Sequence, residues 1–479
     1  MATKSRSPDA APESGPPAAG ATARAAAETG NNRDMSAGPA AAVIRGRRAM
    51  AIPPRVVLGL IAAGAAAAVY LWWASTPDVN GLGGWLTGAG QICGLECGYS
   101  VVVLVALMAR IPPVERGAGA DRLARWHAMG GRYVISLVSA HALLIIWGYA
   151  VEARQNVVAE TGTLLTGYPD VLMATVAWFL LLATAFVSAR KVRSKLRYET
   201  WYYLHLYTYL AIALAFSHQF ADGSAFTTDL AARFWWSALY AVVGAAVLWY
   251  RVVIPARDYV RHDFRVAGVR EEAPRTVSIY VRGRRLRELE AEPGQFFRWR
   301  FLTRGLWWQS HPYSLSAAPS DDLLRITLRD AEGKFAALKP GTRLIAAGPF
   351  GAFMSAGSGH PVLLLAGGVG VAPLRAMFAT LPGPVTLVYR ASSDDDVVFR
   401  PELDSIAAAK GATVHYLVGG RDAFPADPLS APALRELVPG VEQMDVYLCG
   451  PPGMTAAAAA ALHDIGVPRR RVHFESFEF

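Results

Sequence analysis

The chain has 479 residues, enough for two or three domains. Apolar residues make up 53% of it and charged residues only 18%, a balance that argues against a wholly soluble enzyme. The net charge of +9 does not indicate a nucleic-acid partner, because the basic residues lie mainly in loops between apolar stretches. Three cysteines, Cys93, Cys97 and Cys449, are too few for a disulfide framework.

A membrane part follows an N-terminal segment, residues 1–54, that we expect to be a disordered cytoplasmic tail because it is rich in Ala, Pro, Gly and Ser. Six stretches are then long enough to cross a bilayer, which takes about 20 apolar residues. They lie near 56–74, 86–109, 126–150, 169–188, 201–219 and 234–254. Basic residues are concentrated before the first span and after the second and fourth spans. The positive-inside rule therefore predicts a multi-pass cell-membrane protein with both termini in the cytoplasm.

The remainder of the chain has the patterning of two soluble domains. Residues 259–356 hold short alternating strands, expected at 263–269, 276–282, 295–301, 322–329 and 341–347, which predict a small β-barrel. Residues 357–479 alternate helices with apolar strands at 361–366, 384–390, 413–418, 445–449 and 471–474. That alternation predicts a parallel nucleotide-binding sheet. The predicted domains are thus 55–258, 259–356 and 357–479.

Four histidines lie inside two of the predicted spans, where ionisable residues are rare and are functional candidates. His127 and His141 are 14 residues apart in span three, and His205 and His218 are 13 apart in span five. These separations are roughly 20 Å along a helix axis. Cross-helix pairs at matching depths, His127 with His205 and His141 with His218, would each hold one haem iron. Thirteen residues miss the starting helix face by about 140°, so span five is expected to bend or bulge, or to rely on the reach of its imidazoles. A second interpretation is that these histidines hydrogen-bond between helices.

Two such pairs, on the third and fifth of six spans, resemble the ferric reductase and NADPH oxidase superfamily. The similarity extends over about 55–479. It implies a six-span helical bundle with two b-type haems, for which His127, His141, His205 and His218 are the axial ligands. It also implies a ferredoxin-reductase-like pair of domains, a β-barrel for FAD and a parallel α/β domain for NADPH or NADH. Iron with two axial ligands passes electrons on rather than binding oxygen.

The predicted barrel contains a segment similar to the flavin-binding motif of that family, in its His-Pro form: His311, Pro312, Tyr313 and Ser314. In the family the aromatic residue packs on the isoalloxazine, and the hydroxyl and backbone amides bind its polar edge. Gly348 and Gly351 resemble the turn that closes the same domain. The alternative is that the His-Pro-Tyr-Ser segment is simply the start of a strand, as such a segment usually is when it occurs alone.

The last domain contains a glycine-rich turn between an apolar strand and a helix, where backbone amides approach a pyrophosphate. Its candidate cofactor-binding residues are Gly368, Gly370 and Pro373, joined by Gly450 and Pro451 of a later Cys-Gly-Pro-Pro sequence. In the family the cysteine of that sequence, here Cys449, lies beside the nicotinamide; a buried core thiol is the alternative. Arg390 is placed to bind the 2′-phosphate of NADPH, or equally to be a surface residue. Phe477, with Phe479 second, matches the family's terminal aromatic residue over the flavin.

A further group shares one helix face of span two at i, i+3 and i+4 spacing: Cys93, Glu96 and Cys97. An acid inside a membrane is costly without a partner, so the trio is a candidate for holding an incoming metal ion or for supporting an outer haem. Packing of small residues between helices is the alternative, and we favour it.

The resemblance implies an oxidoreductase that passes electrons from NAD(P)H through FAD and two haems to a small-molecule acceptor at the outer face. Ferric iron is the expected acceptor, with oxygen, to give superoxide, and a quinone or protein partner as alternatives. A different class of protein is a haem-free membrane anchor carrying a cytoplasmic flavin reductase. The expected surroundings are membrane lipid, with no nucleic acid.

Overall fold

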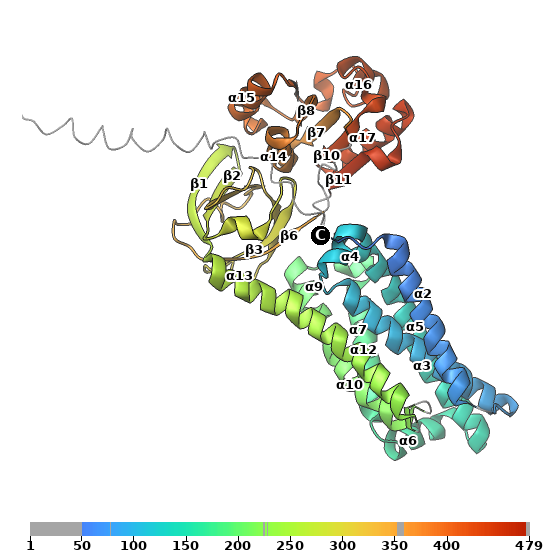
Figure 1. The fold of residues 1–479 in the computed structure, drawn as a ribbon. Coiled ribbons are helices and arrows are strands. Elements are labelled where there is room, and N and C mark those ends of the chain that lie inside the picture. Colours follow the sequence, from blue (N-terminus) through green and yellow to red (C-terminus); the bar gives the residue numbers. More distant parts are fainter. Residues whose placement is uncertain (1–49, 77, 224–225, 228, 352–358, 476–479) are drawn as a thin grey trace, which may run out of the picture. The chain divides into compact units, whose positions relative to one another are not determined.

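The computed structural model describes residues 50–76, 78–223, 226–227, 229–351 and 359–475 (Figure 1). Residues 1–49 of the predicted tail, and the predicted site residue Phe477, lie outside the described residues. From Pro54 to His262 the described chain is helical apart from short connections, and it forms strands and helices thereafter.

Among the described residues, five helical segments are long and apolar enough to cross a membrane: Pro54–Ser75, Gly81–Leu107, Arg122–Ala153, Val171–Ser188 and Leu230–His262. Large apolar side chains on them stay exposed, including Leu60, Trp73 and Phe186 at 65%, 73% and 68%. Helices that are apolar on their exposed faces are suited to lipid rather than water. These segments match five of the six predicted spans. They correspond to α2 (Pro54–Ser75), α3 (Gly81–Leu107), α5 (Ala120–Ala153), α7 (Val171–Ser188) and, with the helix that follows it, α12 (Leu230–Leu248).

The remaining predicted span, 201–219, is two helices, α9 (Tyr198–His205) and α10 (Tyr207–Asp222). They meet at Leu206, whose amide donates to the carbonyls of both Tyr202 and Tyr203 at 3.2 Å. The amide of Tyr209 then donates to the Leu206 carbonyl at 3.0 Å, an i to i+3 bond typical of a tightened turn. Of the alternatives expected for this span, the structure shows a break in the helix, which lies directly after His205.

Four shorter helical elements complete this part of the chain. They are α4 (Pro112–Ala118), α6 (Val157–Gly167), α8 (Arg190–Arg193) and α13 (Ile254–His262). A π-helical turn, Trp249–Val253, joins α12 to α13 without a break. Its Arg251 donates to the carbonyl of Met108 at the end of α3, at 3.0 Å.

The strands between residues 265 and 350 form two three-stranded antiparallel sheets. One has the order β1 (Arg265–Ala273), β2 (Thr276–Arg282), β5 (Leu323–Arg329), and the other β4 (His311–Ser314), β3 (Phe296–Phe301), β6 (Leu344–Phe350). Both contribute to one core, in which Ile279, Trp299 and Ile326 are fully buried. Isolated bridges Leu315–Ile326 and Arg265–Arg343 link the two sheets. Closure into a barrel stays a prediction.

The last part of the chain forms a five-stranded sheet in which every pairing is parallel, in the order β11-β10-β7-β8-β9. The central strand β7 (Val362–Gly367) is buried throughout, as expected for a parallel strand covered on both faces. Helices α14 and α15 pack on the face that includes Leu364, and α16 and α17 on the face that includes Leu363. The other elements are β8 (Val385–Ala391), β9 (Thr413–Val418), β10 (Asp445–Cys449), β11 (Val472–Glu475), α14 (Val371–Thr380), α15 (Arg400–Lys410), α16 (Ala431–Leu437) and α17 (Pro452–Ile465).

Candidate functional site

The structure brings the four intramembrane histidines together in the two expected pairs. The ring centres of His127 on α5 and His205 on α9 are 5.9 Å apart, with an interplanar angle of 71°. Those of His141 on α5 and His218 on α10 are 6.3 Å apart, with an angle of 58°. Metal–imidazole bonds are about 2 Å long, so one ion between two imidazole nitrogens separates the ring centres by roughly 6 Å. Both pairs have the spacing that a shared iron requires.

Each of these imidazoles has a partner at Nδ1, which leaves Nε2 as the nitrogen for a metal. His127 and His141 face carbonyl oxygens of α3, Leu104 O at 3.1 Å and Gly90 O at 2.8 Å. A carbonyl can only accept, so Nδ1 carries the proton in both. His205 Nδ1 lies 3.4 Å from the hydroxyl of Ser188, which also accepts from Trp201 at 3.2 Å. His218 Nδ1 lies 3.0 Å from a carboxylate oxygen of Asp222.

The packing of α3 against α5 explains how α3 reaches the His141 ring. A Cβ added to Gly94 would lie 2.8 Å from His141 Nδ1, closer than such atoms approach. Glycine at position 94 therefore leaves the space that the imidazole occupies. The carbonyl of Gly90, one turn away, accepts from the same nitrogen. These acceptors were not predicted from the sequence, because a main-chain carbonyl has no sequence signature.

The trio on span two does not form a ligand set. Cys97 Sγ lies 3.8 Å from the carbonyl of Val134, and Glu96 Oε1 is buried with no hydrogen-bond partner among the described residues. Within those residues, no group of three His, Cys, Asp or Glu side chains is arranged to hold a metal ion. Packing between helices, the favoured alternative, fits Cys97.

The predicted flavin segment is strand β4, which pairs with β3 so that His311 lies opposite Trp299 and Tyr313 opposite Phe297. The rings of His311 and Tyr313 are stacked, with an interplanar angle of 3° and centres 5.7 Å apart. Nε2 of His311 is buried and has no hydrogen-bond partner in the described part of the chain. Burial lowers the pKa of His311 and raises that of Tyr313. An aromatic platform beside an unsatisfied nitrogen suits a ligand with a flat ring and polar groups.

Other residues of this predicted site surround the same strand. Pro312 is the register partner of Arg298 on β3, and Ser314 that of Phe296. Arg298 is a candidate that the sequence analysis missed: burial lowers its pKa, and no ion pair or hydrogen bond is found for it among the described residues. Gly348 lies in β6, where a Cβ would come within 2.6 Å of the Phe297 ring, and Gly351 follows that strand.

The two predicted nucleotide motifs meet at the carboxyl ends of neighbouring strands. Gly368 and Gly370 form a tight turn between β7 and α14, and Pro373 lies in the first turn of α14. Cys449 ends β10, beside Ala366 of β7, and Gly450 and Pro451 lead into α17. Strand order reverses between β7 and β10, and nucleotides bind outside parallel sheets at such a reversal.

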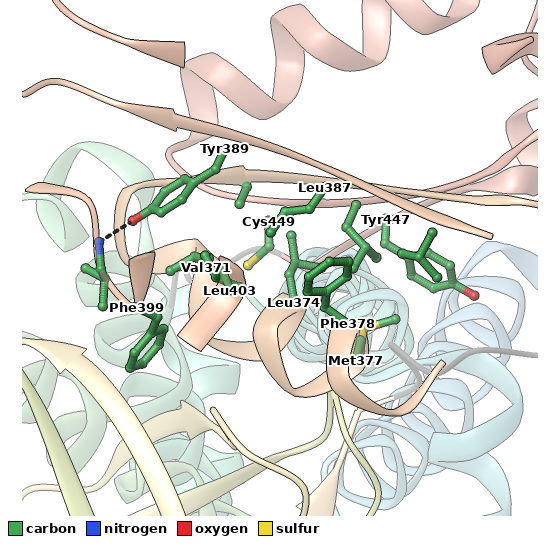
Figure 2. Packing of buried hydrophobic residues seen from close by; sticks show 14 of the residues in the cluster. Val371, Leu374, Met377, Phe378, Leu387, Tyr389, Phe399, Leu403, Tyr447 and Cys449 are labelled. Carbon is green, nitrogen blue, oxygen red and sulfur yellow. Dashed lines mark hydrogen bonds between the residues drawn. The ribbon is translucent and has the colours of Figure 1, made fainter. Parts of the chain in front are cut away.

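Close backbone contact between the two motifs is visible at Gly370, where an added Cβ would lie 2.4 Å from the Cys449 carbonyl oxygen. The Cys449 side chain is fully buried and packs with Val371 and Leu374 of α14 (Figure 2). This packing fits the alternative of a core thiol. A contact of Cys449 with a nicotinamide stays a prediction.

Arg390 lies near the end of β8, opposite Gly367 in register. Its guanidinium donates to the carbonyls of Ala391, Leu417 and Gly420 at 2.6, 2.9 and 3.3 Å, and lies 4.8 Å from the centre of the Phe424 ring. These bonds hold the side chain in place, and no ion pair with a carboxylate is found for it among the described residues. Binding of a 2′-phosphate by Arg390 stays a prediction.

Three family models match the chain, one in each of its parts. The ferric reductase like transmembrane component matches residues 93–216, the FAD-binding domain 266–352 and the oxidoreductase NAD-binding domain 364–460. The first range includes His127, His141 and His205 and ends two residues before His218.

Two similar proteins each match less than half of this chain. A flavohemoprotein of Deinococcus radiodurans is 32% identical over 39% of the chain and 51% of its own length. The ferredoxin reductase component of a 3-ketosteroid-9-alpha-monooxygenase from Mycobacterium tuberculosis is 31% identical over 40% of the chain and 56% of its own length. The chain thus spans about half the length of these relatives. The FAD/NAD-binding domain of a Vibrio cholerae nitric oxide dioxygenase is 24% identical, with a TM-score of 0.38 over 44% of this chain and 96% of that one.

These matches join a membrane component to the FAD- and NAD-binding halves of an NAD(P)H-dependent flavin oxidoreductase. The chain therefore has the domain architecture of the ferric reductases and NADPH oxidases.

Proposed function

We propose that the protein passes electrons from NADPH or NADH, through FAD and two b-type haems, to ferric iron at the outer face of the membrane. The observation that carries this proposal is the presence of two facing histidine pairs. The ring centres are 5.9 Å apart in His127–His205 and 6.3 Å apart in His141–His218. They lie in or directly beside the part of the chain that matches the ferric reductase transmembrane component.

The residues present fit a haem in each pair. Nδ1 of every histidine is engaged, so that Nε2 is the nitrogen available to iron. Two imidazoles would hold each haem, and a haem held in this way would supply electron transfer rather than a binding site for a substrate. We therefore assign His127, His205, His141 and His218 the task of holding and orienting two electron carriers.

The assignment of FAD to the predicted flavin segment rests on unsatisfied polar groups there and does not depend on the histidine pairs. Among the described residues, Nε2 of His311 is buried without a hydrogen-bond partner, and Arg298 is a half-buried cation without an ion pair. An anionic and polar ligand at this segment would satisfy both. Tyr313, stacked on His311, presents an aromatic ring to a flat ligand. Pro312, Ser314, Gly348 and Gly351 complete this part of the proposal.

The nicotinamide cofactor is assigned to the reversal between β7 and β10. There the turn at Gly368 and Gly370, with Pro373 behind it, offers backbone amides at the start of a helix. Gly450 and Pro451 form the opposite side, next to Cys449. We assign Arg390 to the 2′-phosphate of NADPH, and Phe477 to the flavin.

When bound, FAD would accept two electrons from the nicotinamide cofactor and pass them on one at a time, and the haems would carry these electrons across the bilayer. The chain's own residues position these groups and exclude water. The basic residues around α8, Arg190, Lys191 and Arg193, favour the cytoplasmic side for the pair His127 and His205, the inner pair. His141 and His218 are then the outer pair, which would hold the outer haem. We accordingly propose six spans in residues 55–258, FAD binding in 259–356 and NAD(P) binding in 357–479, with both termini in the cytoplasm.

The test is the visible spectrum and haem content of the purified, anaerobic protein before and after NADPH. We expect two low-spin haems per chain, and the loss of one in either His141→Ala or His205→Ala. His463→Ala is the matched control, since this exposed histidine lies in the nucleotide domain. A protein with reducible flavin but no haem would refute the proposal and favour the membrane-anchored flavin reductase. Ferric citrate, oxygen and a quinone, added in turn to the reduced protein, then identify the acceptor.

A further inference from the structure

One of the four predicted ligands differs from the others in its Nδ1 partner. His218 Nδ1 donates to Asp222 Oδ2 at 3.0 Å, whereas the other three imidazoles meet neutral oxygens. Those partners are the carbonyls of Leu104 and Gly90 and the hydroxyl of Ser188. Of the four ligands, only the one on α10 is therefore held by a charged group.

The helix itself places this carboxylate. Asp222 lies four residues after His218 on α10, so the two side chains share one helix face. Their side chains are 22% and 19% exposed, so the contact is largely shielded from water. Asp222 makes no ion pair with an arginine or lysine in the described part of the chain. Its charge therefore acts on the imidazole without a competing cation.

We propose that Asp222 is a positioning residue for the outer haem that lowers the reduction potential of that haem. The inference rests on the proposed function, because it requires iron between His141 and His218. A hydrogen bond from Nδ1–H to a carboxylate makes the imidazole a stronger electron donor to the metal. Stronger donation, with a nearby negative charge, stabilises ferric over ferrous iron. The outer haem then becomes a stronger reductant toward an acceptor than it would be with a neutral partner.

Spectroelectrochemical titration of the purified holoprotein tests this, because it measures both haem potentials independently of any acceptor. In Asp222→Asn, the side chain keeps an oxygen that accepts from Nδ1 but loses its charge. We expect one of the two potentials to rise by about 59 mV or more, a tenfold shift in a one-electron equilibrium, while the other stays unchanged. Asp222→Glu, which restores the charge, should return the potential toward the native value.

Asp170→Asn is the matched control, because Asp170 precedes α7 and its side chain caps no helix amide. Both potentials should be native in this variant. Native potentials in Asp222→Asn, or equal shifts in Asp222→Asn and Asp170→Asn, would overturn the inference. If Asp222→Asn loses the outer haem while Asp222→Glu keeps it at a native potential, the inference is supported. Absence of haem from the native protein would instead refute the proposed function, so the two failures are distinguishable.

Discussion

The guanidinium of Arg325 binds both carboxylate oxygens of Glu402, with Nη1 and Nη2 donating at 2.8 and 3.0 Å. Arg375, on α14, donates to the same carboxylate at 2.7 Å. Arg325 also donates to the hydroxyl and carbonyl of Ser316, two residues after the flavin segment, at 3.2 and 3.0 Å. Glu402 thus joins a strand beside the proposed flavin site to the helix that begins at the proposed nucleotide turn.

Glu402→Gln should slow flavin reduction by NAD(P)H and reduce stability. The amide of glutamine cannot neutralise the two arginines. Leaving a largely buried arginine unpaired lowers the free energy of unfolding, here by about 2–3 kcal/mol because the carboxylate itself is partly exposed. The corresponding fall in Tm is about 5–10 °C. Stopped-flow flavin reduction and thermal unfolding measure the two effects. Glu436→Gln, on the exposed side of α16, is the control. A native reduction rate in Glu402→Gln would show that this cluster does not position the cofactors.

The same carboxylate predicts how stability depends on pH. Burial disfavours its charge, but hydrogen bonds and charges of Arg325 and Arg375 prevail and lower the pKa of Glu402. A lowered carboxyl pKa contributes stability above the unfolded value, about 4.3, which is lost as pH falls toward the folded pKa. The difference in Tm between native protein and Glu402→Gln should therefore be constant from pH 8 to about 5 and shrink below about 4. A difference that grew on acidification would contradict this assignment.

Much of this architecture follows from local patterns in the sequence. Continuous apolar runs predicted the membrane helices and strand β9, and alternation predicted strand β2; both strands have the predicted boundaries. The spacing of His205 and His218 predicted a bend, a bulge or a reliance on the reach of the imidazoles, because 13 residues do not return to one helix face. It did not predict the position, since Leu206 is neither Gly nor Pro and its tightened turn depends on the surrounding helices.

Long-range partners could not be predicted in the same way. Glu402 is 77 residues from Arg325, and a surface helix pattern gives no reason to expect its carboxylate between two arginines. Arg298 was not predicted because an arginine in an antiparallel strand is usually solvated, whereas here it is half-buried. The contact between Asp222 and His218 could have been predicted, because an acid four residues after a candidate ligand lies on the same helix face.

The close approach of Gly94 to the His141 ring predicts that even Gly94→Ala will reduce haem binding. The Cβ of Gly94→Ala would lie 2.8 Å from His141 Nδ1 and 2.9 Å from Cε1 of the same ring, so the imidazole must move. Overpacking of this kind costs about 1–3 kcal/mol. We expect the haem-to-protein ratio to fall from two toward one, measured by absorbance of the reduced protein. Gly244→Ala, on α12 with open space around it, should retain both haems. Full haem content with native potentials in Gly94→Ala would show that α3 does not constrain this ligand.

The contact between the two nucleotide motifs predicts a selective loss of cofactor binding. A Cβ at Gly370 would lie 2.4 Å from the carbonyl oxygen of Cys449 and 2.8 Å from the amide of Gly450. Both are backbone atoms at the end of a buried strand, so the glycine turn must move away from β10. An overpacking cost of about 1–3 kcal/mol applied to the bound cofactor raises KM for NAD(P)H by about 5- to 150-fold.

Gly370→Ala should leave haem content and FAD content native, because neither proposed site includes this turn. Gly453→Ala is the matched control: it lies in the first turn of α17, close along the chain to the same motif, and an added Cβ there meets nothing within 4 Å. Steady-state kinetics with a fixed artificial acceptor separate KM from kcat. Equal KM values for Gly370→Ala, Gly453→Ala and the native protein would place the nicotinamide cofactor away from the reversal between β7 and β10.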